Sequence, residues 1–531
     1  MSGVATSRSI SLQGAVGHLV DVQVDVSPGS VGATIVGRAD VTLNEARERC
    51  RMAITNEHLT WPATRRVTIL LSPADLAKRG THFDLAIAVT VLAASEQVEA
   101  DALRDTVLIG ELTLDGRLRS VPGVLPMVMA ASAAGVRRVF VPEPQAREAA
   151  MVPGMAVFGM RSLGQVVAEL KGVEVPEAPE VAPMSGTRLL SWRGDARRDE
   201  VDLADLHGLD DARFALQVAA AGGHHLMLEG PKGSGKTSLV ERLPGILPDL
   251  SAEERLELTA IHSLAGALEP GDGLLRRPPY CAPHHSASAA SLLGGGSGRV
   301  RPGELSRAHG GVLFLDELPF FHTDVLEALR QPMESGEVTI ARGEETATFP
   351  ARTMLVVAAN PCVCGNYGTG MQHRCTCTEQ QRRTYRARLS GPLIDRIDIT
   401  RHVVAARPAP EDVPWGSPAA TTAEVRAVVE AARERQSRRW AGRSWRLNAH
   451  APGPVLSREF PLPAPARGVV DEEVYAGRLS RRGATRVHRM AWTLADLSAA
   501  DAPTAEHVTA ALALRGGDPL PLSALDLEVA G

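Results

Sequence analysis

"HHLMLEGPKGSGKTSLVERL" (residues 224–243) joins a short apolar run, a glycine-rich turn and the start of a helix. It matches the pattern G-x-x-x-x-G-K-[ST], with its last two positions at Lys236 and Thr237. In such a loop, backbone N–H groups and the helix N-terminus surround phosphates, and the lysine adds a positive charge. We therefore expect a nucleotide site in which Thr237 binds Mg²⁺, and the strand–loop–helix context disfavours a turn without a ligand. The predicted nucleotide-binding residues are Gly230, Pro231, Lys232, Gly233, Ser234, Gly235, Lys236, Thr237 and Ser238.

Three further segments carry candidate catalytic residues. "GGVLFLDELPFF" (310–321) reads as a buried strand followed by Asp316, a candidate Mg²⁺ ligand, and Glu317, a candidate general base. "RTMLVVAANPC" (352–362) is another apolar strand, and its Asn360 could orient the attacking water. "LSGPLIDRIDI" (389–399) places Arg396 between two aspartates. The alternatives are surface carboxylates, a turn made by Asn-Pro and a salt-bridged surface arginine, respectively.

Composition indicates a soluble protein with more than one domain. The chain has 531 residues, of which 44% are hydrophobic and 22% charged, and its formal net charge is −5. Its longest apolar stretches, such as residues 85–94, are shorter than the roughly 20 residues needed to cross a bilayer. We expect a cytoplasmic protein without a membrane partner. Any binding to nucleic acid must use a local basic surface.

Hydrophobic patterns divide the chain into four parts. Residues 1–170 alternate β-branched runs with Ala-rich helical stretches, which predicts an α/β domain. Residues 171–200 include "VEVPEAPEVAPMSG" and predict an extended linker. Residues 201–404 form a second α/β block around the phosphate loop, and residues 405–531 have a mainly helical pattern.

The order of these motifs resembles that of AAA+ P-loop ATPases. "APHHSASAASLLGGG", "RPGELSRAHGGVLFLDELPFF", "LRQPMESGEVTIAR" and "NPCVCG" resemble, more closely, the magnesium-chelatase-like YifB/ComM family. The resemblance covers nearly the whole chain and implies an ATPase that forms a ring, expected to be a hexamer, with ATP at the subunit interfaces. It implies that Arg396 is an arginine finger. The sensor-2 arginine best matches Arg482, with Arg486 as an open alternative, and residues 405–531 would be the helical lid.

The N-terminal part resembles the proteolytic domain of Lon proteases, which has a ribosomal S5-like fold, without its catalytic pair. The stretch 110–142 has Leu125 where that family carries its lysine, and "KRGTHFDLAIA" (78–88) lacks the serine. A nucleophile and its base are both needed for an acyl intermediate, so we expect the fold without peptide hydrolysis. His82 and Asp84 are expected to form a structural pair.

Four of the six cysteines lie in "CVCGNYGTGMQHRCTC" (362–377). Four thiolates can complete a tetrahedral Zn²⁺ site, and the pairs follow Asn360 closely. Alternatives are reduced cysteines without metal, redox chemistry or another metal, and His373 is a possible substitute ligand. Cys281, near His284 and His285, is expected to be structural. The candidate zinc ligands are Cys362, Cys364, Cys375 and Cys377.

Three functions remain open. The family resemblance implies a DNA motor, specifically a helicase that drives branch migration in recombination or DNA uptake. Basic side chains for DNA occur in 383–390, in 425–450 and in a hairpin-like stretch, 336–349, that contains Arg342. The glutamates among the arginines of 425–450 favour, as an alternative, an ion-paired surface. The other two functions are a magnesium-chelatase ATPase subunit and a protein-remodelling ATPase.

Overall fold

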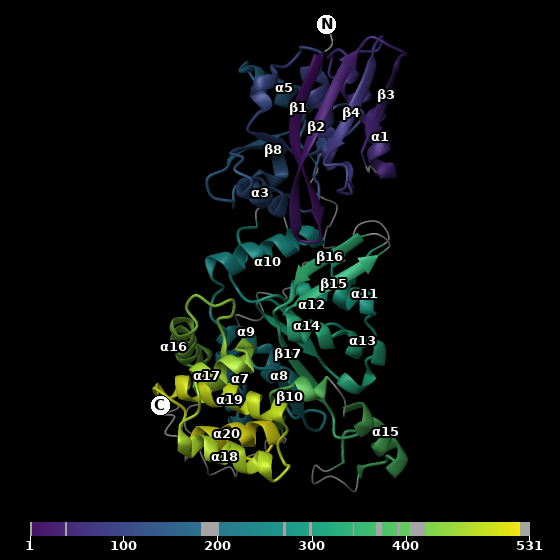
Figure 1. Ribbon diagram of the computed structural model, residues 1–531. Coiled ribbons are helices and arrows are strands. Elements are labelled where there is room, and N and C mark those ends of the chain that lie inside the picture. The colour runs from purple at the N-terminus through teal and green to yellow at the C-terminus, as the bar shows by residue number, and fades with distance from the viewer. Residues whose placement is uncertain are drawn as a thin grey trace.

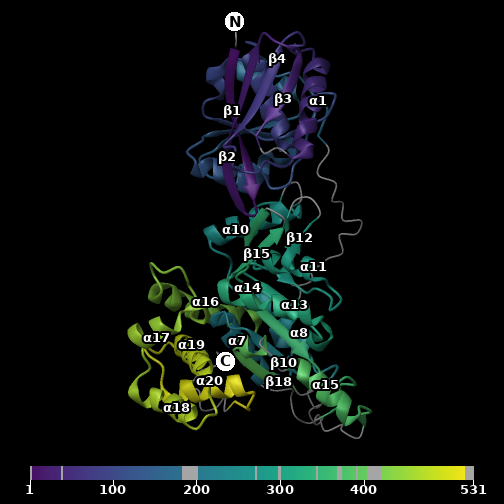
Figure 2. The ribbon, with the colours of Figure 1, turned by 45° about the vertical axis from the view of Figure 1, so that its right-hand side comes forward.

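The chain forms three parts, of which the N-terminal and central parts are stacked along one long axis (Figure 1). The computed structural model describes residues 3–37, 40–181, 201–268, 272–296, 300–342, 345–367, 374–389, 393–403 and 420–520. The N-terminal part lies at one end, the central part carries the phosphate loop, and the C-terminal helices lie beside the central part (Figures 1 and 2). Most of the predicted linker lies outside the described residues.

The N-terminal part is built on a seven-stranded sheet with the order β3-β4-β2-β1-β5-β8-β9. Its longest pair, β1 and β2, runs antiparallel from Gly3 opposite Val26 to Gln13 opposite Val16. On β2, every second residue from Val20 to Val26 is buried, because only one face of this strand meets the core. The strands are β1 (Gly3–Gln13), β2 (Val16–Ser27), β3 (Gly32–Val36), β4 (Arg66–Ser72), β5 (Thr106–Leu108), β6 (Glu111–Leu112), β7 (Leu118–Arg119), β8 (Arg138–Pro142) and β9 (Ala156–Met160).

Helices cover this sheet and bury the positions that correspond, in the sequence resemblance, to the catalytic segments of Lon proteases. Leu125 is fully buried, and its N–H donates to Glu148 Oε1 at 2.9 Å. The expected His82–Asp84 pair takes another form: Asp84 accepts two hydrogen bonds from Arg49, at 2.7 and 3.0 Å, and His82 Nε2 lies 2.8 Å from the Ile10 carbonyl oxygen. The helices are α1 (Val41–Asn56), α2 (Asp84–Ala94), α3 (Val124–Ala133), α4 (Ala146–Ala149) and α5 (Leu163–Lys171).

The central part contains a five-stranded parallel sheet with the order β11-β14-β17-β10-β18. Both faces are covered, which explains why its strands read as continuous apolar runs. Leu226 and Val356 point into the core beneath the C-terminal helices, whereas Met227 and Leu355 point into a second core on the opposite face. The strands are β10 (Leu226–Glu229), β11 (Tyr280–Cys281), β14 (Val312–Leu315), β17 (Met354–Ala359) and β18 (Ile399–His402).

Short helices and two small hairpins surround this sheet. The helices are α7 (Asp210–Gly222), α8 (Lys236–Glu241), α9 (Leu243–Ile246), α10 (Ala252–Ala265), α11 (Ala289–Leu293), α12 (Glu304–Arg307), α13 (Thr323–Ala328), α14 (Arg330–Ser335) and α15 (Glu379–Leu389). The hairpins are formed by β12 (Gly294–Gly295) with β13 (Arg301–Pro302), and by β15 (Glu337–Arg342) with β16 (Glu345–Pro350).

The β15–β16 hairpin confirms the hairpin expected in 336–349, and it contacts the N-terminal part. The N–H of Ala15, next to the turn between β1 and β2, donates to the Thr348 carbonyl at 3.3 Å. Gly14 adopts φ +60° there, and a Cβ on it would lie 2.7 Å from the Thr348 oxygen. A second contact joins Ser263 on α10 to Glu148, whose pKa is raised by burial. The hairpin therefore lies between the central sheet and the N-terminal part.

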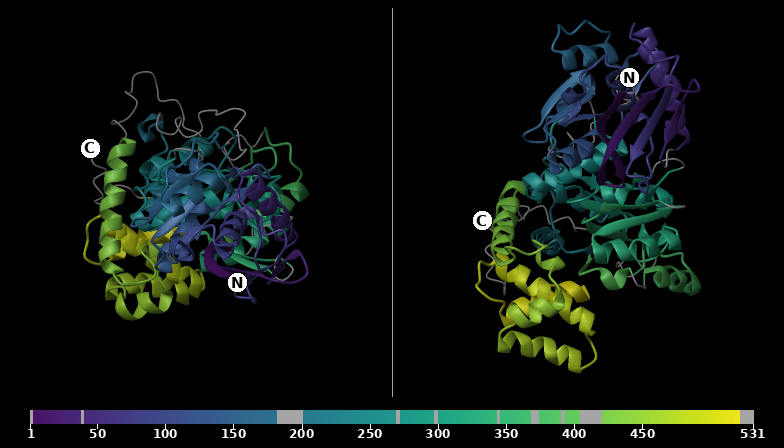
Figure 3. Two further views of the ribbon diagram at one scale, coloured as in Figure 1. Left: turned by 90° about the horizontal axis from the view of Figure 1, so that it is seen from above. Right: turned by 45° about the horizontal axis from the view of Figure 1, so that its top comes forward.

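In the C-terminal part, every regular element between residues 420 and 516 is a helix. This agrees with the mainly helical pattern of the sequence. Its helices share one hydrophobic core with α7 and one face of the central sheet, and they form a separate group beside it (Figure 3, right). No helix among the described residues is long and apolar enough to cross a bilayer. The helices are α16 (Thr422–Arg439), α17 (Gly453–Glu459), α18 (Ala464–Tyr475), α19 (Arg481–Leu497) and α20 (Ala505–Gly516).

Candidate nucleotide-binding site

The phosphate loop connects β10 to α8 at the carboxyl edge of the sheet, where parallel α/β sheets bind ligands. Gly233 and Gly235 have φ values of +75° and +89°, which are strained for residues with a Cβ. Gly230 is needed for a different reason: a Cβ there would lie 2.2 Å from the Val403 carbonyl oxygen on the neighbouring segment. The glycines thus allow both the turn and the close approach of the backbone.

Lys236 is folded into the loop that precedes it. Its Nζ donates to the carbonyl oxygens of Gly230 and Pro231, at 2.7 and 2.8 Å, and to Asn360 Oδ1 at 3.3 Å. Burial lowers the pKa of this lysine, and the charges of the two carboxylates at 316 and 317 partly oppose that shift. The Ser234 hydroxyl is buried without a hydrogen-bond partner among the described residues. An unpartnered hydroxyl beside a lysine fits a phosphate oxygen.

Asp316 and Glu317 follow β14 directly and face the phosphate loop. Thr237 Oγ1 lies 3.2 Å from Asp316 Oδ2, so two of the hard oxygen donors that Mg²⁺ prefers meet at one place. Glu317 has φ +53°, and its N–H donates to Asp316 Oδ1 at 2.8 Å. A non-glycine residue held in this region costs on the order of 1–3 kcal/mol, and such strain is common at functional positions.

Asn360 lies at the end of β17, beside the strand that enters the phosphate loop. The Gly230 N–H donates to the Ala359 carbonyl at 3.1 Å, which holds the two segments together. Tyr385 on α15 is a neighbour that sequence reasoning missed: its buried position raises the pKa of its hydroxyl to about 12, and the charge of Glu317 contributes. The structure therefore brings together Lys236, Thr237, Asp316, Glu317 and Asn360.

Arg396 lies at the amino ends of the strands, on the side of the sheet opposite the phosphate loop. It ends a 3₁₀ turn (Ile394–Arg396) just before β18, whose first residue pairs with Leu226 and whose last pairs with Glu229. A four-residue strand spans about 13 Å, so this edge is remote from the loop that follows Glu229. Arg396 Nη2 donates instead to Glu334 Oε1 at 2.6 Å. Arg396 is therefore not part of the phosphate site of its own chain.

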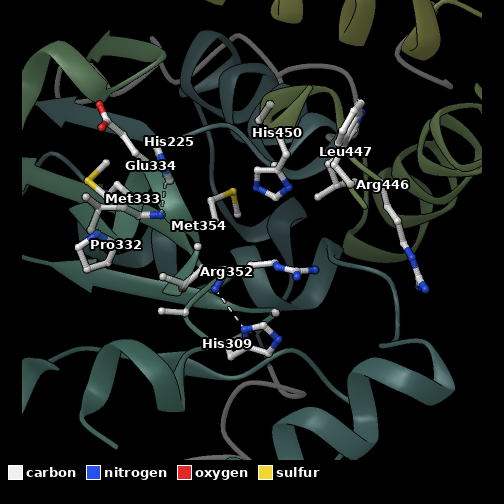
Figure 4. Close-up of a pocket in the computed structure, with 18 of the residues that line it drawn as sticks. His225, His309, Pro332, Met333, Glu334, Arg352, Met354, Arg446, Leu447 and His450 are labelled. Atoms are coloured by element: carbon white, nitrogen blue, oxygen red, sulfur yellow. Dashed lines mark hydrogen bonds between the residues drawn. The ribbon is translucent and has the colours of Figure 1, made fainter. Parts of the chain in front are cut away.

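A cavity of about 980 Å³ occupies this amino edge, between the sheet and the C-terminal helices (Figure 4). Burial lowers the pKa of His225 to about 4 and that of His450 to about 3, so arginines carry the positive charge of the cavity at neutral pH. His309 Nδ1 accepts a hydrogen bond from the Arg352 N–H at 3.1 Å across its floor. The arginines among its lining residues are Arg352, Arg396, Arg433, Arg443, Arg446, Arg482, Arg486 and Arg489.

The two sensor-2 candidates have different surroundings. Arg482 is 74% exposed, and its Nη1 lies 3.8 Å from Asp395 Oδ2. Arg486 is largely buried and bonds Asp398 at 2.5 Å. Burial opposes ionisation of Asp398, but the hydrogen bond from His224 and the charge of Arg486 outweigh it and hold its pKa well below the ordinary value. Arg486 is thus committed to an ion pair, whereas Arg482 is accessible to a partner.

The cysteines come together as expected. The sulfur atoms of Cys362, Cys364, Cys375 and Cys377 all lie within 4.8 Å of one another. His373 lies outside the described residues. His284 Nδ1 lies 2.7 Å from Ser286 Oγ, and its ring packs against His285 with the centroids 4.0 Å apart.

The Arg-rich helix α16 is mainly structural. Arg433 donates to the Ala220 carbonyl, and Arg439 forms a buried ion pair with Asp496. Arg438 is exposed but paired with Glu434. The ion-paired alternative therefore describes this helix better than a DNA surface. The side chain of Arg342 lies outside the described part of the hairpin.

Comparisons with protein families agree with this architecture. The model described as magnesium chelatase, subunit ChlI, matches residues 202–410. A model described as subunit ChlI of Mg-chelatase matches residues 22–145, and one for the ChlI C-terminal region matches residues 419–515. All three parts of the fold are therefore covered.

Relatives match the chain over nearly its full length. A protein of Mycobacterium tuberculosis H37Rv is 44% identical over 507 residues, which are 96% of this chain and 97% of that protein. YifB of Escherichia coli K12 is 39% identical over 503 residues, 94% of this chain and 95% of YifB. Competence protein ComM of Haemophilus influenzae is 38% identical over 513 residues, 96% of this chain and 97% of ComM. The chain therefore belongs to the magnesium-chelatase-like YifB/ComM family.

Proposed function

We propose that the protein is an ATP-hydrolysing ring motor that moves branched DNA, a branch-migration helicase in recombination or DNA uptake. The meeting of Lys236, Thr237, Asp316 and Asn360 at one sheet edge supports ATP hydrolysis. The DNA substrate is supported by the nearly full-length likeness to a competence protein, because competence is the uptake of DNA. The magnesium-chelatase descriptions of the family models keep a chelatase-type subunit as the second candidate.

In this proposal, the site residues position ATP and water for attack at the γ-phosphorus. The loop N–H groups and Lys236 bind the phosphates, and Asn360 and Glu317 hold the attacking water. Glu317 accepts the water proton while the bond to the β–γ bridging oxygen breaks, which releases ADP and phosphate. Mg²⁺, held by Thr237 and Asp316, would neutralise charge that develops on the phosphates.

Assembly into a ring, expected to be a hexamer, is supported by the position of Arg396. A chain whose arginine finger lies at the edge opposite its phosphate loop needs a neighbour to complete the site. Head-to-tail contacts of this kind form a ring when the rotation between neighbouring subunits closes. Arg482, which is exposed on the same cavity, is the better candidate for a second arginine directed at the neighbour's nucleotide.

Helix α15 is the better basic surface for DNA. It has four arginines and one glutamate, and Arg382 and Arg386 lie 4.5 and 5.0 Å from the ring centroid of Tyr367. Arginines around an aromatic ring are typical of surfaces that track single strands. By contrast, the buried arginines of α16 already have partners.

A four-way-junction migration assay with ATP tests the function. We expect the wild-type protein to bind and move the junction, and Lys236→Ala to fail. Binding should weaken steeply with salt, by roughly 10³ between 50 and 200 mM if about six phosphate contacts form. If protein with confirmed ATPase activity neither binds nor moves branched DNA at low salt, the remodelling function replaces this proposal. Stimulation by a porphyrin-metallating partner instead of DNA would favour the chelatase-type subunit.

Two matched arginines test the DNA surface. Arg383 on α15 and Arg438 on α16 are 80% and 71% exposed, and each pairs with a glutamate four residues earlier. Arg383→Glu should weaken DNA binding and reduce the salt slope by about 1, as expected for one lost phosphate contact. Arg438→Glu should leave both unchanged. Equal effects of the two variants would contradict the assignment to α15.

A further inference from the structure

The four-cysteine cluster has the geometry of a metal site. Cys362 Sγ lies 3.4 Å from Cys364 Sγ and 3.9 Å from Cys375 Sγ, and the last two sulfurs are 3.6 Å apart. Four thiolates around one Zn²⁺ at about 2.3 Å would be about 3.8 Å from one another, the edge of a tetrahedron. A disulfide would instead require about 2.05 Å. The sulfurs are thus spaced as ligands of one ion, not as bonded pairs.

The donor set selects the type of metal. Four thiolates favour Zn²⁺ over hard cations such as Mg²⁺ and Ca²⁺, which bind oxygen. A set with four protein ligands leaves no open position for water or substrate, so the ion would have a structural role. Cys362 is fully buried and the other three sulfurs belong to partly exposed residues, so the cluster is anchored on one side and accessible to a metal on the other.

The cluster is connected to three parts of the nucleotide site. Cys362 follows Asn360 by two residues, and its carbonyl accepts a hydrogen bond from the Gly365 N–H at 3.0 Å. Gly365 adopts φ +84° and lies against the phosphate loop, where a Cβ would be 3.2 Å from Lys232 Cγ. The knuckle around Cys362 therefore contacts the loop that holds the phosphates.

The second cysteine pair leads into α15. Thr378 Oγ1, next to Cys377, accepts from the Gln381 N–H at 3.2 Å at the start of that helix. Near the end of α15, Arg388 donates to the Pro319 carbonyl at 3.0 Å, two residues beyond Glu317. An ion that joins the two pairs would therefore tie the Asn360 segment and the phosphate loop to the helix that packs beside Glu317.

We propose that Cys362, Cys364, Cys375 and Cys377 bind one Zn²⁺ per chain, and that this ion holds Asn360 and the phosphate loop in position for ATP hydrolysis. The metal site does not depend on the proposed function, whereas its effect on turnover rests on the proposed ATPase. Zinc content and ATP turnover are both measured without DNA, so failure of the DNA-motor proposal is distinguishable from failure of this one.

Metal content tests the site directly. The full-length protein, purified under reducing conditions with added Zn²⁺ and then dialysed, should contain about one zinc per chain by elemental analysis. Co²⁺ in its place should give the intense visible bands and sulfur-to-metal charge transfer of tetrahedral thiolate cobalt. A mercurial titration should release the zinc as four thiols react. Wild-type protein without bound zinc, or with octahedral cobalt, overturns the proposal.

Variants test the ligands and the effect on turnover. The double variant Cys375→Ser/Cys377→Ser should lose the zinc, whereas Cys281→Ser, outside the cluster, should keep it. The double variant should retain ATP binding but lose at least tenfold in kcat, because the water-positioning segment is no longer held. Zinc retained in the double variant refutes the ligand assignment, and normal kcat without zinc refutes the positioning role. If the double variant does not fold, the same kcat comparison is made on wild-type protein before and after mercurial release of the metal and its reversal by thiol and Zn²⁺.

Discussion

Mixing two inactive variants, Arg396→Ala and Glu317→Gln, should restore ATP turnover that neither has alone. The phosphate loop and Glu317 lie at the carboxyl edge of the central sheet, whereas Arg396 precedes β18 at the amino edge. The strand between these edges spans about 13 Å, and an arginine side chain reaches only about half that distance. Each active site would therefore combine Glu317 of one subunit with Arg396 of the next.

The expected magnitude follows from this geometry. Loss of an arginine finger lowers kcat by about 10³ or more, and loss of the general base should be similarly severe. In a ring assembled at random from equal amounts of both variants, a complete site needs an Arg396→Ala subunit followed by a Glu317→Gln subunit. That arrangement has a probability of about one quarter for a closed head-to-tail ring, so the mixture should recover about a quarter of the wild-type rate if the sites act independently.

The assay is steady-state phosphate release after the two variants are unfolded, mixed and refolded together, or co-expressed with different tags and purified through both. Lys236→Ala mixed with Glu317→Gln is the matched control. Both substitutions of this control change the phosphate site of the chain that carries them, so every site in the ring stays defective. A rate no greater than the sum of the separate variants, in rings shown to contain both tags, would refute the assignment of Arg396 to the neighbour's site.

Three other experiments have expected outcomes. Lys236→Ala should lose binding of a fluorescent ATP analogue together with turnover, whereas Glu317→Gln should bind the analogue and fall below about 1% of the wild-type rate, since only the base is removed; wild-type turnover by Glu317→Gln would show that another group is the base. Because the pKa of Asp398 is depressed in the folded protein, its ion pair stabilises the fold above the unfolded pKa of about 3.9 and loses that effect as pH falls further. Asp398→Asn should therefore unfold at a lower urea concentration than the wild type at pH 7, and the difference between the two midpoints should narrow below about pH 4. A difference that widens in acid would contradict this direction of the pH dependence. Purified protein should not cleave casein with ATP, since Leu125 is apolar and fully buried; cleavage that persists after removal of contaminating proteases would disprove the loss of peptidase activity.

Local sequence determined much of the candidate nucleotide site. The sequence predicts a glycine-rich turn here, and the structure has it, with positive φ at Gly233 and Gly235. The apolar runs before Asp316 and Asn360 predict buried strands, because strands covered on both faces have no polar side. The hairpin at 337–350 was also predictable from the sequence, because two β-rich runs flank a short turn. In each case the information lies within about ten neighbouring residues, which is the range over which backbone preferences act.

Only the tertiary structure decided which of these segments meet. Lys236 and Asn360 are 124 residues apart and touch because β10 pairs with β17 in the sheet order. Arg396 precedes β18, and β18 runs parallel to β10, so Arg396 lies at the amino end of the strands although its motif reads like the others. Arg439 belongs to the Arg-rich stretch 425–450 that was a candidate for DNA contacts, yet it is buried against Asp496 on a helix 57 residues away. The sequence shows that an arginine is charged, but long-range packing determines its partner. Desolvation and the nearest carboxylate decide whether that charge stabilises the fold or remains available to a ligand.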